Sequence, residues 1–564
     1  MIKEDKNWWK TAVIYQIWPY SFNSTSETGY GNLQGIIDKL DYIKGLGVDA
    51  IWLSPIFVSP NKDKGYDISD YKNINCLFGD VQLAEKMIQE AHKRGLRVLF
   101  DMVVNHTSNQ HYWFQDAKKS KDSKYRDYYI FREGNGGKEP NDWQSVFSGP
   151  AWTYNKETDD YYLHLFDSSQ PDLNWMNPKV REEIFDIVRF WMSRGVDGWR
   201  IDALCSIRKN PDIYKYPMPK TPGPETIIDK QLHDWVKQLC AVIREKPDAI
   251  IIGEVGGASF EEIANFTAES RNELTASILF DIVTSDYDFS KGIGKFFISG
   301  FDLTKIKNVL NGWYSRNDTS IALHIQSHDQ PRIVSRWGDD EYEAYRVKSA
   351  KMLGTFNQML KGLPIVYQGE EIGMINWKFN LDQVDDVEIK RNYKELVVEK
   401  KLFTDEEFLK AARYCSRDNA RTPVQWTDGE NAGFSSVKPW LPVNDSYKTI
   451  NVQNSLKDKN SIFYYYKKLI QLRKTEKLLI DASFHLALNN SDKVLAFMRE
   501  KDDMRIVVLC NFSPDVVKIS THDIAFNFTQ AFLVLIANYD DMEMEGDTLI
   551  VRPYETFVIK GNNK

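Results

Sequence analysis

The sequence has little cysteine, and the cysteines it has follow no metal-binding or redox pattern. Its 564 residues include five cysteines, widely spaced and without a CxxC pair. This spacing disfavours zinc sites and dithiol redox chemistry. Isolated cysteines of this kind are typical of buried free thiols in a reducing compartment.

Long apolar runs are also absent. No stretch approaches the roughly 20 apolar residues that a membrane-spanning helix needs, so we expect no membrane partner. The first ten residues, MIKEDKNWWK, lack the apolar core of a secretory signal. We therefore expect a cytoplasmic protein, whose oligosaccharide substrates would have to be short enough to be imported.

Excess positive charge is missing as well. The net charge is -8, which argues against a basic surface that follows a phosphate backbone, and we expect no nucleic-acid partner. Aromatic residues, in contrast, make up 13% of the chain and include 16 tryptophans. Many of these rings belong to the core, but their faces also suit packing against sugar rings.

Short β-branched runs alternate with longer amphipathic stretches over most of the chain, which predicts βαβ units and a parallel sheet. Eight such runs are present, and eight parallel strands with intervening helices specify an α/β fold, the closed (β/α)8 TIM barrel. An open doubly wound sheet is the alternative, but no glycine-rich phosphate turn follows the first run. The predicted strands are residues 12–18, 50–53, 97–104, 198–203, 250–255, 277–282, 321–327 and 363–367.

Two segments interrupt this alternation of strand and helix patterns and define the predicted domains. Residues 107–174 are rich in Asn, Gly, Trp, Tyr and Asp, which predicts an irregular β subdomain inserted after strand 3. Residues 479–564 alternate in the β manner, which predicts a C-terminal antiparallel β-sandwich. The barrel then consists of residues 1–106 and 175–478, with the charged segment 376–416 lying over its mouth or flank.

Charged side chains stand at the carboxyl ends of several predicted strands, where barrel enzymes place their reacting groups. Any single one of them could be a helix cap or a core histidine, but so many on one rim indicate a site. Arg200 lies two residues before Asp202 on a strand, so both face the same side, and Arg200 is expected to hold Asp202 ionised. The group comprises Asp101, His106, Arg200, Asp202, Glu254, His328 and Asp329.

A pair of carboxylates with a third acidic group fits glycoside hydrolysis. One carboxylate attacks the sugar, and the other, kept protonated by like-charged neighbours, donates its proton to the leaving oxygen.

Several motifs, in order along the chain, resemble the conserved regions of the α-amylase-like glycoside hydrolases. They are DMVVNH (101–106), QPDLN (170–174), GWRIDA (198–203), IIGEV (251–255) and SHDQPR (327–332). KGYDISDY, YYLHLF, YQGEEIGM and SRDNARTPVQW are similar to the oligo-1,6-glucosidase and α-glucosidase branch, and trehalose-6-phosphate hydrolases and sucrose isomerases look similar too.

This resemblance implies double displacement with retention of the α configuration, without a cofactor. Asp202 would be the nucleophile, Glu254 the general acid/base, and Asp329 the group that grips the 2- and 3-hydroxyls. A pocket closed beyond the terminal glucose would make the enzyme exo-acting on short isomalto- or malto-oligosaccharides, as a monomer or small homo-oligomer. The residues implied in substrate binding are Asp63, Tyr66, His106, Phe147, Gln170, Arg200, His328 and Arg417.

The sequence departs from the family at four places. Residues 24–32, STSETGYGN, stand where many relatives carry a calcium loop, and most of the oxygen donors that Ca²⁺ needs are gone, so we expect no metal. Ala203 follows the nucleophile where relatives that prefer α-1,6 bonds usually carry valine. Ser327 replaces the usual asparagine, and Gly256 and Gly257 follow the acid/base.

Three alternatives stay open on the sequence. A trehalose-6-phosphate hydrolase would need a cationic cluster, which Lys209, Lys215 and Lys220 could supply, although a solvated lysine face is the commoner cause. A sucrose isomerase would release isomaltulose, not free glucose and fructose. A non-catalytic relative acting as a binding subunit would lack catalytic carboxylates and carry a membrane helix, and neither holds here.

Overall fold

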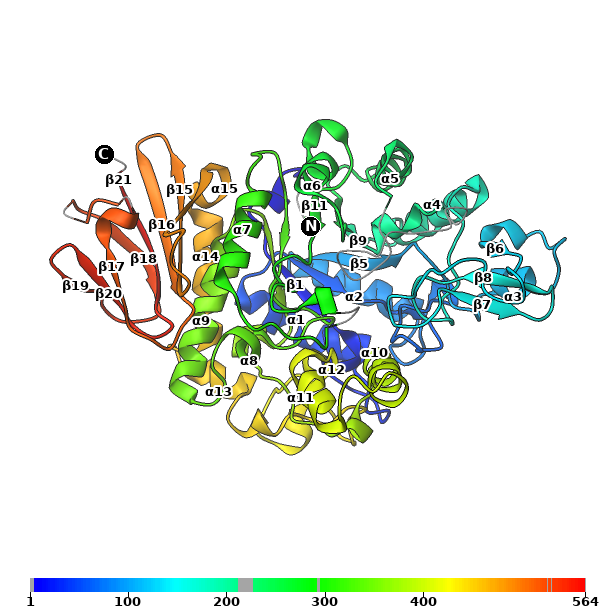
Figure 1. Cartoon of the computed structure of the whole chain (residues 1–564). Coiled ribbons are helices and arrows are strands. Elements are labelled where there is room, and N and C mark those ends of the chain that lie inside the picture. The colour runs from blue at the N-terminus through cyan, green and yellow to red at the C-terminus, as the bar shows by residue number, and fades with distance from the viewer. Residues whose placement is uncertain (1–4, 211–226, 292–294, 525, 529, 563–564) are drawn as a thin grey trace.

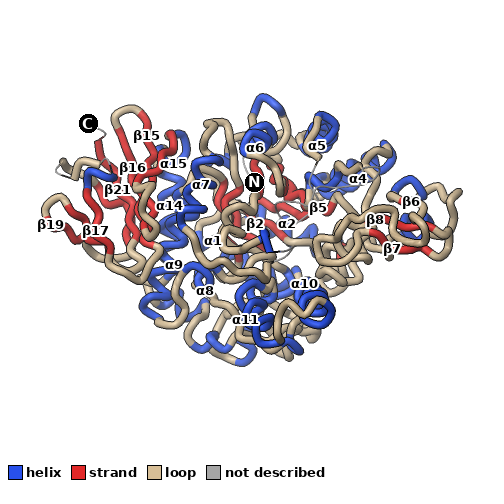
Figure 2. The backbone as a smooth tube through the Cα atoms, viewed as in Figure 1, coloured by secondary structure: helices blue, strands red, loops and turns tan. Residues whose placement is uncertain are grey.

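The eight apolar strands of the barrel pair in parallel in one sheet, with helices around it (Figure 1, Figure 2). The computed structural model describes residues 5–210, 227–291, 295–524, 526–528 and 530–562. The strand order is β11-β10-β9-β5-β2-β1-β13-β12, and a parallel bridge from Ser277 to Ile321 joins the two end strands. The sheet is therefore a closed (β/α)8 barrel, as the sequence predicts.

The barrel strands follow the predicted order along the chain. Their bounds are β1 Ile14–Ile17, β2 Ala50–Leu53, β5 Arg97–Val103, β9 Gly198–Asp202, β10 Ile250–Glu254, β11 Ala276–Ile278, β12 Ala322–Leu323 and β13 Leu363–Tyr367. Alternate side chains fill the interior with an apolar layer that includes Ile14, Trp52, Leu99 and Ile252. The others pack outward against the helices, which is why these strands are apolar on both faces.

A helix of the surrounding ring follows each barrel strand. The bounds are α1 Leu33–Leu46, α2 Val81–Lys93, α4 Pro178–Met192, α5 Lys230–Ile243, α6 Phe260–Thr267, α7 Leu303–Trp313, α9 Glu343–Met359 and α14 Ile462–Thr475. Side-chain caps begin several of them. Asn32, for example, accepts a hydrogen bond from Gly35 N at 2.8 Å at the start of α1.

The sixth and seventh strands are shorter than predicted. The apolar run 321–327 contributes only β12, Ala322–Leu323, to the sheet, because from His324 onward the backbone leaves the ladder and turns toward the mouth of the barrel. β11 likewise ends at Ile278. The sequence correctly predicts that the run is buried, but burial beyond Leu323 comes from the site and not from strand pairing.

The inserted segment carries a small antiparallel sheet beside the barrel, seen in cyan in Figure 1. Its strands are β6 Phe131–Arg132, β7 Trp152–Asn155 and β8 Asp160–Leu163, in the order β6-β8-β7, and α3 Tyr112–Ala117 precedes them. A bridge from His106 to Asp172 and a hydrogen bond from Leu173 N to Asn105 O at 2.8 Å tie the end of the segment to the residues after β5, and a bridge from Tyr129 to Leu173 lies within the segment.

The C-terminal region forms two antiparallel sheets, in red and orange in Figure 1, and the five-stranded one packs against α9 and α14. One has the order β14-β15-β16-β21-β18 and the other β17-β20-β19. The bounds are β14 Ser483–Ala487, β15 Val494–Lys501, β16 Met504–Asn511, β17 Val517–Ser520, β18 Leu533–Ala537, β19 Glu543–Glu545, β20 Thr548–Val551 and β21 Thr556–Asn562. The sequence missed β14, β17 and β19. All three residues of β19, Glu-Met-Glu, are exposed, so this short alternation marks no buried face.

Segment 376–416 contains α10 Val387–Asn392, a π-helical turn Tyr393–Glu399 and α11 Asp405–Cys415. These pack around their own apolar cluster, which includes Phe379, Phe408 and Leu396. An ion pair between Lys64 and Asp385 at 2.7 Å shows that the segment reaches the mouth of the barrel, as predicted.

Candidate active site

Four charged side chains meet at the carboxyl ends of β5, β9 and β10. In the sheet register Arg200 pairs with Asp101 on one side and Ile252 on the other, so these residues share one level of the barrel. Asp202 and Glu254 lie two residues further along their strands, and therefore one level up and on the same inward face. The sequence placed these groups on one rim, and the barrel brings them into contact.

Arg200 is the centre of this cluster. Its Nη1 donates to Asp101 Oδ1 at 3.0 Å and to Asp202 Oδ1 at 2.7 Å, and its Nη2 donates to Glu254 Oε1 at 2.9 Å. The Arg200 side chain is only 2% exposed. The carboxyl groups of Asp202 and Glu254 thus face one shared space from neighbouring strands, with a single positive charge between three acidic side chains.

This sharing changes the expected electrostatics. Arg200 pairs with Asp202 as predicted, but it does not hold the pKa of Asp202 low. Burial raises the pKa of Asp202 well above its usual range, Arg200 opposes that rise, and Glu254 and Asp101 add to it. Burial likewise raises the pKa of Asp101 to about 6, against the pull of Arg200.

We expect kcat/KM to rise with pH through about 6. As the predicted nucleophile, Asp202 would need to be ionised; its pKa is raised, and the pKa of Asp101 beside it is about 6. Because these carboxyl groups interact, they release their protons in shared steps. A profile of kcat/KM from about pH 4 to about pH 8 tests this, and an acid limb near pH 4, the ordinary carboxyl range, would contradict it.

Protein stability serves as the control for that profile, because these groups act on it with the opposite sign. A carboxyl whose pKa is raised on folding holds its proton more tightly in the folded chain. Its contribution to the free energy of unfolding is therefore largest at low pH and is lost as pH rises through about 6. Circular dichroism over the same pH range separates acid unfolding, caused by other groups, from loss of catalysis.

Glu254 makes a second contact of a different kind. Its Oε2 accepts a hydrogen bond from the main-chain N–H of Ala203 at 2.7 Å. Ala203 has φ 44° and ψ 40°, in the left-handed region that residues other than glycine seldom adopt. Both oxygens of Glu254 are therefore hydrogen-bond acceptors in this structure.

Asp329 lies across the site in a different electrostatic setting. Its carboxylate contacts His328 Nε2 at 3.0 Å, Arg421 Nη2 at 3.1 Å and Arg417 Nη1 at 3.5 Å. Burial alone would raise its pKa, but His328 and the two guanidinium groups hold the pKa of Asp329 well below its usual range. The site thus contains one firmly ionised carboxylate and a separate cluster that retains protons.

The other predicted binding residues form one connected wall. Gln170 Nε2 lies 3.2 Å from Asp63 Oδ2 and 3.1 Å from His106 Nε2, and Asp63 Oδ1 lies 3.5 Å from Arg417 Nη2. The Arg417 guanidinium lies over the ring of Phe147, 5.3 Å from its centroid. Burial raises the pKa of Asp63 to about 6 and lowers that of His106 to about 3. His106 is therefore a neutral hydrogen-bonding group.

Tyr66 lies against His328 and Asp101. Its ring stacks on His328 with centroids 5.4 Å apart, and its hydroxyl donates to Asp101 Oδ2 at 3.0 Å. Gln16 Nε2 donates to His328 Nδ1 at 2.8 Å, which leaves the proton of His328 on Nε2, facing Asp329. Burial lowers the pKa of His328 to about 4, so the imidazole stays neutral.

Sequence reasoning missed three contributors. Arg421 donates a hydrogen bond to Asp329, and Trp18 stacks on His328 with ring centroids 5.1 Å apart. Asp386 accepts a hydrogen bond from Arg417 Nε at 3.0 Å. Arg421 lies one helical turn after Arg417, a spacing that could have predicted a shared target. Asp386 comes from the segment 376–416, and no motif marked it. Asp418, the next residue after Arg417, accepts hydrogen bonds from the main-chain N–H groups of Asp385 and Asp386.

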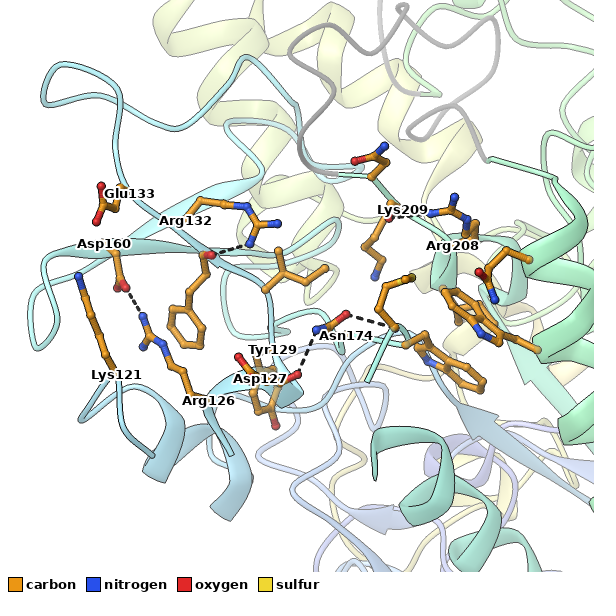
Figure 3. A pocket seen from close by; sticks show the side chains of 18 residues that line it. Lys121, Arg126, Asp127, Tyr129, Arg132, Glu133, Asp160, Asn174, Arg208 and Lys209 are labelled. Atoms are coloured by element: carbon orange, nitrogen blue, oxygen red, sulfur yellow. Dashed lines mark hydrogen bonds and ion pairs between the residues drawn. The ribbon is translucent and has the colours of Figure 1, made fainter. Parts of the chain in front are cut away.

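Lys209 is not available to a leaving sugar. Its ammonium donates to Asp172 Oδ2 at 2.6 Å and to Asn105 Oδ1 at 2.7 Å, and its side chain is 4% exposed. It lines a cavity of about 620 Å³ between the inserted sheet and α5, which none of Asp202, Glu254 and Asp329 lines (Figure 3). The other two lysines of the predicted cluster, Lys215 and Lys220, lie outside the described residues.

The loop at residues 24–32 is held by its own hydrogen bonds. Thr25 Oγ1 donates to Asn32 Oδ1 at 3.0 Å, the same oxygen that caps α1. Within the described ranges, no group of three or more His, Cys, Asp or Glu side chains is placed to hold a metal ion.

We therefore expect a chelator to leave the melting temperature unchanged, because the loop 24–32 lacks most of the oxygen donors that Ca²⁺ needs. Differential scanning fluorimetry with and without EDTA measures this. A clear drop in melting temperature that added Ca²⁺ reverses would contradict it.

A closed (β/α)8 barrel with acidic groups from adjacent strands around one guanidinium is the architecture of a barrel glycoside hydrolase. Comparison with known families agrees. The family model for the α-amylase catalytic domain matches residues 16–482, and that for the maltogenic amylase C-terminal domain matches residues 485–558. The chain belongs to the α-amylase family.

Individual relatives are similar over nearly their whole length. An oligo-1,6-glucosidase from Heyndrickxia coagulans is 42% identical over 98% of this chain and 99% of its own. A crystal structure of the trehalose-6-phosphate hydrolase of Bacillus licheniformis has a TM-score of 0.91 at 39% identity, covering 98% of this chain and 99% of that one. An isomaltulose synthase from Klebsiella sp. LX3 has a TM-score of 0.91 at 34% identity, covering 99% and 100%.

In the part of the chain that the structure describes, no helix combines the length and the apolar character needed to cross a bilayer.

Proposed function

We propose that this protein is a retaining, exo-acting α-glucosidase that releases glucose from short isomalto- or malto-oligosaccharides. The observation that carries the proposal is that Asp202 and Glu254 come from adjacent strands and contact the same guanidinium at 2.7 and 2.9 Å. The oligo-1,6-glucosidases that the chain resembles support the choice of substrate class.

In the first step the Asp202 carboxylate attacks the anomeric carbon, and the bond to the glycosidic oxygen breaks. Glu254 gives its proton to that oxygen, which leaves as an alcohol, and glucose remains as a β-linked ester on Asp202. In the second step Glu254 takes a proton from water, the water oxygen attacks the same carbon, and the ester bond breaks. Two inversions release α-glucose and restore both side chains.

Asp329 supports both transition states. Arg417, Arg421 and His328 hold it ionised, so it offers two acceptor oxygens to the sugar hydroxyls and a negative charge to the oxocarbenium-like centre. Asp63, His106 and Gln170 supply further polar groups along the neighbouring wall.

The exo action follows from how the pocket is closed. Arg391 of α10 pairs with Asp167 of the inserted segment, and Ser148 hydrogen-bonds to Glu395. Lys64, beside Asp63, pairs with Asp385 of the segment 376–416. These contacts join the inserted segment and segment 376–416 on the side of Asp63 and Gln170, so we infer that no further sugar extends past the terminal glucose.

One substrate panel tests the proposal. Isomaltose, maltose, panose, trehalose-6-phosphate and sucrose are incubated with the protein and the products identified. Glucose release from isomaltose or maltose as the α-anomer is expected. Preferred cleavage of trehalose-6-phosphate, or isomaltulose from sucrose, would replace the proposal by one of its alternatives. The buried pairing of Lys209 with Asp172 argues against a phosphate site there.

Ala203→Val is expected to raise the ratio of α-1,6 to α-1,4 cleavage, because a β-branched side chain fills space beside the leaving sugar. Alanine already pays the general cost of the left-handed region, and a β-branched valine fits that region less well, so we also expect a lower melting temperature. Rates on isomaltose and maltose measure the ratio. An unchanged ratio would remove residue 203 from linkage specificity.

The predicted domain limits, 1–106 with 175–478, 107–174 and 479–564, stay part of this proposal, as does a cytoplasmic location. The five cysteines are all unpaired, four of them buried, which supports a reducing compartment.

A further inference from the structure

The backbone turns sharply immediately after Asp202. Ala203 has φ 44° and ψ 40° and leads directly into a 3-10 turn, Leu204–Ile207. A left-handed alanine costs about 1 kcal/mol or more, and such strain persists where the surroundings impose it, often at active sites. Alanine fits this turn better than a β-branched residue but is still strained in it, so the turn calls for an explanation.

The turn changes where one N–H points. The ladder between β9 and β10 ends at the pair Ile201–Gly253, and the next free N–H, that of Ala203, donates to the Glu254 side chain at 2.7 Å. Arg200 Nη2 occupies the other oxygen at 2.9 Å. The Glu254 side chain is only 13% exposed, so few water molecules compete for these positions.

Two donors aimed at one carboxyl group favour its charged form, since a hydrogen bond to a charged acceptor is about twice as strong as one to a neutral acceptor. Glu254 must be an acid in the first step and a carboxylate in the second. The N–H of Ala203 therefore helps the half of the reaction in which Glu254 removes a proton from water, and offers nothing to proton donation.

We propose that the main-chain N–H of Ala203 is a positioning group that holds Glu254 as the base for the hydrolytic second step. This rests on the proposed function and extends it. The left-handed turn after the nucleophile is the device that delivers the N–H, and the side chain of residue 203 is secondary to it.

An amide-to-ester replacement tests the proposal without changing any side chain. Incorporating L-lactic acid at position 203 by nonsense suppression replaces the N–H by an oxygen, and re-incorporating alanine by the same route is the matched control. With α-glucosyl fluoride, whose leaving group needs little protonation, a fluoride burst establishes that the second step limits kcat. With isomaltose, kcat/KM reports the first step.

The ester protein is expected to lose about tenfold in kcat on α-glucosyl fluoride, while kcat/KM on isomaltose changes by less than about twofold. Provided that the alanine control still hydrolyses both substrates, equal losses in both steps, or no loss in either step, overturn the proposal. If the alanine control itself hydrolyses neither, the proposed function fails and this inference fails with it.

Two further measurements separate positioning from a general structural effect. In a Glu254→Ala background the ester should leave the azide-rescued rate unchanged relative to alanine, because the group through which the N–H acts is gone. Ala203→Gly keeps the N–H but frees the backbone, so the same selective loss of the second step is expected at a smaller size, about two- to threefold. A loss in the Glu254→Ala background, or equal effects of glycine on both steps, counts against the proposal.

Discussion

Asp202→Ala is expected to lower kcat/KM on p-nitrophenyl α-glucoside by at least about 10⁴-fold and to leave the fold intact. The covalent step has no other nucleophile at this position, so the loss falls on the transition state. Arg200 keeps Asp101 and Glu254 as partners after the change, so no buried charge is left unpaired. Steady-state kinetics and thermal melting measure the two effects, with a shift of a few degrees at most expected.

Rescue of Asp202→Ala by azide provides a second test of Asp202 as the nucleophile. The space left by the carboxylate can admit the anion, which attacks the anomeric carbon from the nucleophile's side and yields β-glucosyl azide. Asp101→Asn is the matched control: it also removes a charge from Arg200 but keeps the nucleophile, so azide should not rescue it. More than a trace of activity in Asp202→Ala, or no azide product, would show that Asp202 is not the nucleophile.

Glu254→Gln should cost about 10³-fold on isomaltose, within the range that general acid/base catalysis supplies, and much less on α-glucosyl fluoride. Glutamine has the same shape, but its single carbonyl oxygen can accept from only one of the two donors, the Ala203 N–H or Arg200, and its NH2 group then faces the other donor. The poor leaving group of isomaltose needs the proton that glutamine cannot give, whereas fluoride needs little. Comparing kcat/KM for the two substrates measures the difference.

The stereochemistry of azide rescue completes this second test. In Glu254→Ala the nucleophile is intact, so azide enters in the second step and the product should be α-glucosyl azide, the opposite anomer to that from Asp202→Ala. Proton NMR of the product distinguishes the two. Equal losses on isomaltose and the fluoride, or a β product, would place the acid/base elsewhere.

The barrel could be predicted because its strands are buried on both faces. Such strands appear in the sequence as continuous apolar runs, and β1, β2, β5, β9, β10 and β13 all fall within predicted segments. The limits of β11 and β12 could not be predicted in this way. Both predicted runs extend past the point where pairing stops, where Leu279, Ile282 and Ile325 are buried without pairing to a neighbouring strand.

The residues of the site likewise fall into those that the sequence predicts and those that it does not. Asp202, Glu254 and Asp329 stand in motifs tied to strand ends, so their meeting on one rim follows from the order of the elements. Asp386 belongs to a charged segment without a motif, and Gln16 to the first strand, where one polar residue among apolar ones carries no sign of its partner. The contacts of such side chains with the site form only when distant segments pack together, so the sequence alone does not predict them.

The sequence by itself determined the family, the barrel and the identity of the acidic side chains, since strand periodicity and the residues at strand ends are local properties of the chain. Only the tertiary structure decided how charge is shared among them. Arg200 serves three carboxyl groups at once, and Ala203 turns its N–H toward Glu254. The pKa of a buried group depends on every charge within a few ångströms and on the water excluded around it, and these quantities exist only once distant segments have packed together.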